Sequence, residues 1–227
     1  MVQKDKKLII YGDSKYAEMI ANLFINDSPY EVVAFCVDKE YKTRDKIDGI
    51  KVFNLEDINR HFSKEHYIFS AIGYKSVRTH KILYKKIAAL SYPVASYVSS
   101  KAMIDSSSKI AQNCLILSGV IVEPNVDIKE NCFINSGVII CHDAKIKEHS
   151  ILAAGSIIGG YASVGESSLI GFNSTVTELV NVADETLLGA GSILLNDTQE
   201  ATLYLGTPAK AIRTHKDTGI VLEPQKS

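Results

Sequence analysis

The sequence has almost no net charge, no long apolar run and no closely paired cysteines, and each absence excludes a class of function. Its 227 residues carry a formal net charge of −1, so no overall field attracts nucleic acid or an anionic membrane. No apolar stretch is long enough to span a bilayer. The N-terminal MVQKDKK leads only into LIIYG, which does not resemble a secretory signal. We therefore expect a cytoplasmic protein that acts neither on nucleic acid nor in a membrane.

What the sequence does contain is a hexapeptide repeat. From Val98 to Leu194 an aliphatic residue falls at every sixth position, and a small or β-branched residue follows four positions after each. Each hexad supplies one short strand and one turn, and stacked coils bury a continuous column of aliphatic side chains. Three hexads form one triangular coil, and parallel strands set the rise between coils at about 4.8 Å. The repeat predicts a left-handed parallel β-helix of slightly more than five coils.

Cysteine and histidine are too sparse in the repeats for a metal site. The four cysteines are Cys36, Cys114, Cys132 and Cys141, without a CxxC pair. Cys114 and Cys132 are stacked by the repeat, and we expect both to be reduced, small core residues. Only two histidines lie in the repeats, whereas a catalytic zinc needs three protein ligands. We expect no metal.

The first 93 residues follow a different pattern, in which apolar runs alternate with helical segments. Strands are expected at 7–11, 32–37, 51–53 and 67–73, and helices at 17–25 and about 75–90, with a capped short helix starting at 54–57. This alternation predicts a small parallel sheet of Rossmann type. The predicted organisation is mixed, with a Rossmann-like α/β domain at 1–93 and a left-handed β-helix with a C-terminal cap at 94–227.

Ligands of parallel sheets bind beyond the carboxyl ends of the strands, which points to the loop 12–16. This loop has one glycine where a dinucleotide fingerprint has three, so an NAD site is not expected. A short loop that opens a helix could still bind a diphosphate through its backbone N–H groups. The alternative is a packing domain with an ordinary turn. The residues that could contact a nucleotide are Gly12, Ser14, Lys15, Tyr16, Asp38, Gly73 and Arg78.

His142 is the candidate general base. It follows the inward Ile140 by two positions, where a side chain leaves the strand toward a corner, and Asp143 could fix its tautomer. Gly160 lies 18 residues later, one coil above, and its N–H could hold a carbonyl oxygen and its developing charge. The alternative is a solvated surface histidine. Cys141 should point to the opposite side of the strand, and His149 occupies a different corner and is expected at the surface or at an interface.

After the last hexad the segment LYLGTPAKAIRTHK contains Pro208, Lys210 and Arg213. Its positive charge could meet the phosphates of a coenzyme. A solenoid also needs a capping element at its open end, and this segment can serve both purposes.

Several segments resemble the hexapeptide acyltransferases of bacterial surface-sugar biosynthesis. They are IICHDAKI, IIGGYASVG, LIGFNSTV, LLGAGSILL and LGTPAKAIR, in that order. The N-terminal IYGDSKYAEMI, the strand that ends at Asp38 and AIGYKSVR are similar to the branch that contains nucleotide-linked amino-sugar N-acetyltransferases and sialic acid O-acetyltransferase-like proteins. The resemblance covers nearly the whole chain.

This resemblance implies a homotrimer in which each active site lies between neighbouring β-helices. It implies that acetyl-CoA lies along the groove, with a nucleotide sugar held largely by the N-terminal domain. It places the general base on His142, its acidic neighbour on Asp143 and the carbonyl-binding N–H on Gly160. It adds Phe172 and Ala190 as residues that line the coenzyme site. The predicted acetyl-CoA set is Gly160, Phe172, Ala190, Pro208, Lys210 and Arg213.

The sequence departs from the family pattern at three places. Lys15 and Tyr16 replace a glycine and a histidine, Ile151 stands where a second histidine is often found, and Val98-Ser99-Ser100 replaces His-Pro-Ser. The resulting hypothesis is an acetyl-CoA-dependent N-acetyltransferase of a nucleotide-linked 4-amino-dideoxy sugar. Two alternatives stay open, an O-acetyltransferase of a sugar or sialic acid and a non-catalytic scaffold with the same repeats.

Overall fold

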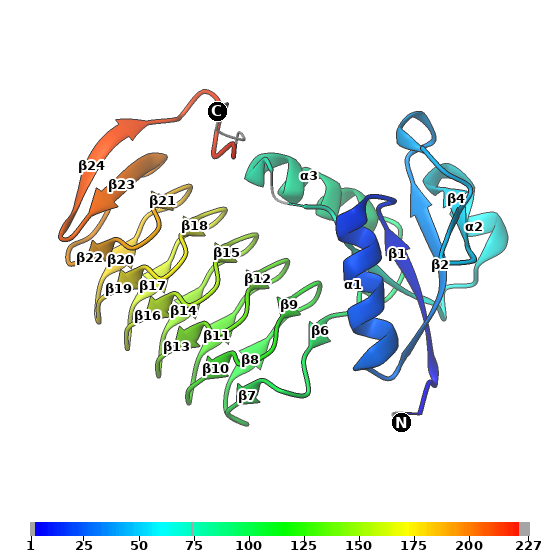
Figure 1. Ribbon diagram of the computed structural model, residues 1–227, viewed down its shortest axis with the longest axis horizontal. Helices are drawn as coiled ribbons and strands as arrows, with labels where there is room; N and C mark the ends of the chain where they lie inside the picture. Colours follow the sequence, from blue (N-terminus) through cyan, green and yellow to red (C-terminus); the bar gives the residue numbers. More distant parts are fainter. Residues whose placement is uncertain (1–2, 74, 223–227) are drawn as a thin grey trace. The chain divides into compact units, whose positions relative to one another are not determined.

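The computed structural model describes residues 3–73 and 75–222 (Figure 1), which form two compact units. The Rossmann-like unit contains the described residues up to Gly73 together with Ile82–Ser100. The β-helix unit contains residues 75–81 and the described residues from Lys101 onward. The division falls after the predicted boundary at residue 93, because Tyr97 packs edge-on against Phe24 with ring centroids 5.3 Å apart. Among the described residues, no helix is long and apolar enough to cross a membrane.

The Rossmann-like unit is a five-stranded sheet in the order β3-β4-β2-β1-β5, and all pairs are parallel except the β3–β4 hairpin. The predicted alternation of strands and helices is confirmed. The strands are β1 (Lys6–Tyr11), β2 (Tyr30–Val37), β3 (Lys46–Ile47), β4 (Ile50–Asn54) and β5 (Tyr67–Ser70). The helices are α1 (Lys15–Asn26), α2 (Ile58–His61) and α3 (Val77–Ala88), with single 3₁₀ turns η1 (Lys39–Tyr41) and η2 (Leu55–Asp57).

Helix α1 follows directly from its sequence. Ser14 is its N-cap, and the Ser14 side chain accepts a hydrogen bond from the Ala17 N–H at 3.3 Å. Its buried residues recur at helical spacing, which turns one apolar stripe toward the sheet: Ala17, Ile20, Ala21 and Phe24. The cap fixes the position of the loop 12–16 at the carboxyl end of β1.

The β-helix unit consists of two-residue strands that stack in parallel with a period of 18 residues, as in the pairing of Ile121 with Ile139 and of Ile139 with Ile157. The predicted left-handed β-helix is confirmed. One face, called the aliphatic face, contains β7 (Met103–Ile104), β10 (Ile121–Val122), β13 (Ile139–Ile140), β16 (Ile157–Ile158), β19 (Thr175–Val176) and β22 (Ile193–Leu194). The next, called the polar face, contains β8 (Lys109–Ile110), β11 (Asp127–Ile128), β14 (Lys145–Ile146), β17 (Ser163–Val164) and β20 (Asn181–Val182).

The third face carries the cap of the solenoid. Its repeat strands are β9 (Leu115–Ile116), β12 (Phe133–Ile134), β15 (Ile151–Leu152), β18 (Leu169–Ile170) and β21 (Leu187–Leu188). Strand β23 (Thr202–Gly206) continues this sheet beside β21, and β24 (Ala209–Thr214) pairs antiparallel with β23. The short strand β6 (Tyr97–Val98) precedes the first full coil. Tyr204 of β23 belongs to the buried cluster of the apolar column, and Ala209 of β24 packs against this cluster.

The interior column matches the period read from the sequence. Every predicted inward residue from Ile116 to Leu194 is at most 2 % exposed. Val98 is 38 % exposed because it lies before the first complete coil, and Ile104 and Ile110 are partly buried. Hydrophobic burial shared between coils therefore stabilises the solenoid.

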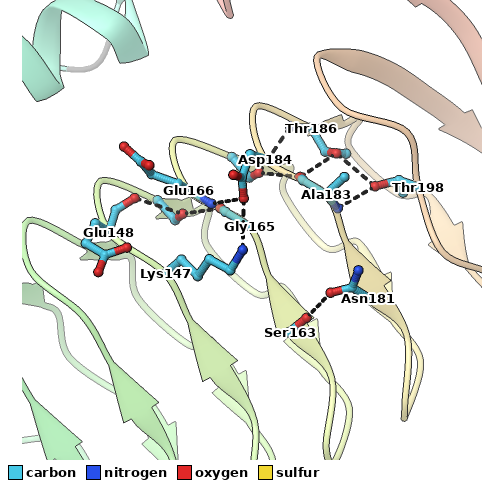
Figure 2. Close-up of polar contacts among 12 residues, drawn as sticks. Lys147, Glu148, Ser163, Gly165, Glu166, Asn181, Ala183, Asp184, Thr186 and Thr198 are labelled. Carbon is cyan, nitrogen blue, oxygen red and sulfur yellow. Dashed lines mark hydrogen bonds and ion pairs between the residues drawn. The ribbon is translucent and has the colours of Figure 1, made fainter.

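The outward residues differ sharply between two faces. On the aliphatic face they are Met103, Ile121, Ile139, Ile157, Thr175 and Ile193. On the polar face they are Lys109, Asp127, Lys145, Ser163 and Asn181. Figure 2 shows hydrogen bonds on and beyond the polar face, where the Asp184 carboxylate accepts from the Glu166 N–H at 2.9 Å and from Lys147 Nζ at 3.1 Å. The polar outward side chains of this face are suited to contact with solvent.

The corners of the solenoid share one backbone feature. A residue in the left-handed region occurs at every sixth position from Asn113 to Gly191. Asparagine and glycine tolerate this conformation best, but Tyr161 and Leu179 also adopt it, with φ of 58° and 64°. Because every corner turns in the same way, residues 18 apart in the sequence lie directly above one another.

Candidate functional site

His142 lies at the corner where the aliphatic face ends. Its side chain is 51 % exposed, and Nδ1 lies 3.1 Å from Asp143 Oδ2. Its backbone N–H donates to Glu123 Oε2 at 2.8 Å, which ties the histidine to the coil below. The ring packs edge-on against Tyr161 with centroids 5.3 Å apart. Four side chains from three coils thus converge on this corner.

The contact with Asp143 determines what the imidazole can do. An ionised carboxylate only accepts hydrogen bonds, so Nδ1 of a neutral His142 must carry the proton and donate it to Asp143. The lone pair then belongs to Nε2, and no described residue donates to Nε2. A neutral imidazole in this tautomer can take a proton at Nε2, and the adjacent carboxylate stabilises the imidazolium that results.

Gly160 lies directly against this ring. A Cβ at position 160 would lie 2.9 Å from His142 Cε1 and 3.0 Å from Nε2, which is closer than nonbonded carbon atoms approach. Among the described residues no acceptor is found for the Gly160 N–H. The structure therefore brings together the predicted base and an N–H that is available to a ligand beside it. The predicted trio of His142, Asp143 and Gly160 is one cluster.

Two residues of this cluster, Glu123 and Tyr161, were not predicted from the sequence. Glu123 lies 19 residues before His142, and its role depends on a backbone hydrogen bond that no spacing rule indicates. Tyr161 was not singled out, yet it is 59 % exposed and its ring packs against the imidazole. The only available signal was the 18-residue period, which places both residues within one coil of His142.

In the Rossmann-like unit, the loop 12–16 lies at the carboxyl end of β1. A side chain at Gly12 would lie 3.1 Å from the Ala71 carbonyl oxygen, and its φ of +130° also requires glycine. A Cβ on Gly73 would be 3.9 Å from the Tyr16 ring, so Gly73 and Tyr16 are neighbours. The Lys15 side chain is 86 % exposed, and its Nζ lies 3.2 Å from Glu18 Oε2. Gly12, Ser14, Lys15, Tyr16 and Gly73 are therefore gathered at one edge.

A segment that sequence reasoning missed holds this loop. The Thr43 N–H and hydroxyl each donate to Asp13 Oδ2 at 2.9 Å, and Arg44 Nε donates to the Asp13 carbonyl oxygen at 2.9 Å. Arg44 also pairs with Glu18 at 3.3 Å. The Arg44 guanidinium therefore lies at the loop 12–16, where the sequence predicts that a diphosphate binds.

Asp38 and Arg78 have partners that the sequence did not indicate. Asp38 is 4 % exposed, accepts a hydrogen bond from Tyr11 Oη at 2.7 Å and pairs with Lys86. Burial, followed by this hydrogen bond, raises the pKa of Tyr11, so the phenol remains the donor. Arg78 belongs to the β-helix unit, where its guanidinium binds the Glu185 carboxylate through two nitrogens. Arg78 is thus engaged within the β-helix unit, whereas the loop 12–16 belongs to the Rossmann-like unit.

The predicted coenzyme residues divide into two groups. Phe172 and Ala190 stack at the corner where the aliphatic face begins, and the Gly191 N–H donates to the Phe172 carbonyl oxygen at 2.8 Å. Both line an apolar pocket of about 290 Å³, which continues over Leu187, Leu203 and Leu205. His142 and Gly160 lie at the other edge of the same face. One chain therefore does not bring the two groups together.

The cationic segment lies on the capping hairpin. Lys210 and Arg213 are exposed on β24, opposite Leu205 and Leu203 of β23, and Pro208 lies in the turn between the strands. Since Leu203 and Leu205 line the apolar pocket, these cations belong to the same end of the solenoid as Phe172 and Ala190. Within the described part of the chain, neither Lys210 nor Arg213 forms an ion pair.

His149 is not at the surface as the sequence analysis expected. It is 2 % exposed, and its Nδ1 lies 3.0 Å from Asn131 Nδ2. Asn113 Nδ2 in turn donates to Asn131 Oδ1 at 2.7 Å. The start of α3 packs on this corner, where His80 Nε2 lies 3.3 Å from the Asn131 carbonyl oxygen. The buried corner side chains then contact one another one coil apart. His149 is a structural residue of this buried ladder.

Two family models match the chain, one for each unit. Residues 7–86 match the PglD N-terminal domain, and residues 98–204 match the GMPPB C-terminal domain. No curated protein sequence matches the chain significantly. Neither family model covers half of the chain.

Solved structures with the same two-part architecture cover nearly the whole chain. The acetyltransferase domain of PglB from Neisseria gonorrhoeae aligns with a TM-score of 0.81 at 20% identity, over 92% of this chain and 100% of that one, and was also solved with acetyl coenzyme A. PerB from Caulobacter crescentus, in complex with CoA and GDP-perosamine, aligns with a TM-score of 0.79 at 20% identity, over 91% and 97%. At this identity the likeness confirms the predicted fold of both halves.

Proposed function

We propose that this chain is an acetyl-CoA-dependent N-acetyltransferase that acts on a nucleotide-linked amino sugar. The observation that carries this proposal is the cluster of His142, Asp143 and Gly160, in which an imidazole with a free Nε2 lies beside an available N–H. A base and an oxyanion donor at one point are what acyl transfer from a thioester requires. The similar structures were solved with acetyl coenzyme A, CoA and GDP-perosamine, which are ligands that this reaction class requires.

The chemistry proceeds through a tetrahedral intermediate. The sugar amine attacks the thioester carbonyl carbon while Nε2 of His142 accepts the proton that the nitrogen loses. The Gly160 N–H donates a hydrogen bond to the oxygen that becomes negative, and Asp143 stabilises the imidazolium. Collapse of the intermediate breaks the carbon–sulfur bond, and the imidazolium returns the proton to the thiolate of CoA. The products are an acetamido sugar and free CoA.

The two groups of coenzyme residues support a homotrimer. They flank opposite edges of the aliphatic face, and this face with its corners carries large exposed apolar side chains: Met103 61 %, Ile157 36 %, Tyr161 59 %, Phe172 57 % and Leu179 71 %. Such a patch is typical of a protein interface. In a cyclic trimer the interface is head-to-tail, so one edge of each copy meets the opposite edge of the next. Each site would then take His142 from one copy and Phe172 from its neighbour.

The nucleotide sugar would bind the edge formed by the loop 12–16 of the Rossmann-like unit. The exposed Lys15 ammonium, the Ser14 helix N-terminus and the Arg44 guanidinium that holds the loop provide positive charge for a diphosphate. The family resemblance favours a 4-amino-dideoxy sugar in bacterial surface-glycan biosynthesis, and this assignment belongs to the proposal.

The test is a thiol-release assay with acetyl-CoA and a panel of UDP-, dTDP- and GDP-linked amino sugars. We expect turnover on one of them and a loss of at least about 10²-fold in kcat for His142→Ala. His66→Ala, which replaces a histidine of the Rossmann-like unit, is the matched control and should retain activity. Turnover only on the corresponding sugar hydroxyls would replace this proposal with O-acetyl transfer, and acetyl-CoA binding without any turnover would favour a scaffold.

The trimer has a test of its own. Sedimentation should give three times the chain mass, and Ile157→Asp should dissociate the assembly. Mixing inactive His142→Ala with inactive Ala190→Trp should restore activity, because in mixed trimers roughly a quarter of the sites receive both wild-type residues. Failure of the mixture to recover activity after verified subunit exchange would show that each site lies within one chain.

A further inference from the structure

The segment 215–222, called the C-terminal strap, folds back along the start of helix α3. The Val77 N–H donates to the Ile220 carbonyl oxygen at 3.1 Å, and the Leu222 N–H donates to the Lys75 carbonyl oxygen at 2.8 Å. Ser76 and Val221 form an antiparallel bridge between these two contacts. All of these residues belong to the β-helix unit.

Arg78 fastens the strap to the solenoid. Its Nε and Nη2 donate to the two carboxylate oxygens of Glu185 at 2.8 and 2.7 Å. The same guanidinium donates to the carbonyl oxygens of Lys216 at 2.7 Å and Asp217 at 3.1 Å. One side chain therefore links a corner of the β-helix to the backbone of the strap.

The fit between Arg78 and the strap is close. A Cβ on Gly219 would lie 2.6 Å from Arg78 Nε, so the strap can pass here only because residue 219 has no side chain. The hydrogen bond from Arg78 lowers the pKa of Glu185, which keeps the carboxylate charged. His215 adds a second anchor, since its Nε2 lies 2.8 Å from the Glu185 carbonyl oxygen.

The end of the strap reaches the coenzyme region. Leu222 lines the apolar pocket of about 290 Å³ together with Phe172 and Ala190. Four hydrogen bonds of Arg78 thus hold the strap, and the strap in turn positions Leu222 in the pocket wall.

We propose that Arg78 is a positioning residue for coenzyme binding, because it holds the strap so that Leu222 completes the wall of the pocket that receives an uncharged part of acetyl-CoA. This inference rests on the proposed function, which assigns Phe172 and Ala190 to acetyl-CoA. It differs from the role that the sequence predicted for Arg78, a contact with the nucleotide.

The planar fork of arginine is essential to this role. Two parallel bonds to Glu185 leave the remaining N–H groups directed at two carbonyl oxygens, and a lysine ammonium cannot reproduce this arrangement. Lys81, on the same stretch of α3, pairs with Glu166, and among the described residues of the strap it has no hydrogen-bond or ion-pair partner. Lys81→Ala is therefore the matched control, since it removes an ion pair between the same elements without touching the strap.

The experiment measures acetyl-CoA binding by titration calorimetry in the full chain, together with steady-state kinetics. We expect Arg78→Ala to weaken acetyl-CoA binding about tenfold or more, with Arg78→Lys only partly restoring it. The KM for the nucleotide sugar should stay unchanged, and amide exchange at Leu222 should become faster. Lys81→Ala should change neither the affinity nor the exchange. Leu222→Ala, which removes the wall without touching Arg78, should weaken acetyl-CoA binding in the same direction.

The possible failures can be told apart. If the wild-type chain binds acetyl-CoA and both Arg78→Ala and Leu222→Ala bind it equally well, this inference is wrong while the proposed function stands. A rise in the KM for the nucleotide sugar with unchanged acetyl-CoA affinity would return Arg78 to the nucleotide site. If the wild-type chain binds no acetyl-CoA, the proposed function fails and this inference fails with it.

Discussion

Replacing Gly160 with alanine tests the geometry of the proposed site most directly. The new Cβ would lie 2.9 to 3.0 Å from two atoms of the His142 ring, whereas ordinary contacts between such atoms are about 3.5–4.0 Å. The ring must therefore move by roughly 0.5–1 Å. A displacement of this size in a catalytic group can lower the rate by up to about 10²-fold. We expect kcat to fall by roughly 10- to 100-fold.

The fold should tolerate this substitution. Gly160 does not adopt a left-handed conformation, so an alanine is not strained there and restricts the unfolded chain, which contributes about 0.4–1 kcal/mol. Gly137→Ala is the opposite control. At Gly137 φ is +71° and nothing lies within 4 Å, so alanine should destabilise the fold by about 1 kcal/mol without affecting catalysis.

Gly160→Ala should lower kcat and leave the fold stable, whereas Gly137→Ala should destabilise the fold and leave kcat unchanged. The assay is thiol release at saturating acetyl-CoA and nucleotide sugar, with urea unfolding of each variant alongside. If Gly160→Ala keeps kcat within about twofold of the wild-type value, the His142 ring does not work from the position seen here, and the base must be sought elsewhere.

Three further predictions follow from individual contacts. Asp143→Asn should lower kcat about tenfold or more and change the pH–rate profile, because an amide neither fixes the Nδ1 tautomer nor stabilises the imidazolium. The hydrogen bond from Arg78 holds the pKa of Glu185 below its ordinary value of 4.5, so the pair stabilises the folded chain above that pH and loses this contribution as pH falls. In urea unfolding, Glu185→Gln should therefore lose less stability than the wild type between about pH 6 and pH 3. Burial raises the pKa of Cys114 to about 12, and Cys36 and Cys132 are equally buried. Burial also raises the pKa of Cys141, but this thiol is only partly buried, so in the native protein a thiol reagent should react with Cys141 first; reaction of a second thiol at the same rate would contradict this.

The β-helix could be predicted because its period leaves few alternatives. An aliphatic residue at every sixth position cannot be placed on one side of a helix or of a long strand, and the structure buries this set from Ile116 to Leu194. The alternation of strands and helices before residue 93 could also be predicted from the pattern of apolar residues. The predicted domain boundary after residue 93 lies before the division seen in the structure, because Tyr97 joins the Rossmann-like unit through its ring contact with Phe24. No local sequence pattern indicates this contact.

Partners distant in the sequence could not be predicted. Arg78 forms an ion pair with Glu185, 107 positions later, and Asp38 forms one with Lys86. Two side chains that were predicted to contact a ligand therefore have partners within the protein. His149 was expected at the surface or at an interface because it occupies a different corner from His142. It is buried instead beside Asn131, one coil below, where His80 from the start of α3 also contacts the Asn131 carbonyl oxygen.

The position of the base within the solenoid has a physical reason. The column that contains His142 reads Ser106, Pro124, His142, Gly160, Glu178 and Asn196 in successive coils. Since each corner turns alike, an imidazole here always lies against the residue 18 positions later. Position 142 is the one place in this column where that neighbour lacks a side chain, so the ring can lie close to the backbone of residue 160. Moving the histidine to position 124 would set it against residue 142, and moving it to 160 would set it against Glu178. The chemistry therefore depends on the pairing of two residues one coil apart, and a search for His142 alone would not distinguish it from any exposed histidine.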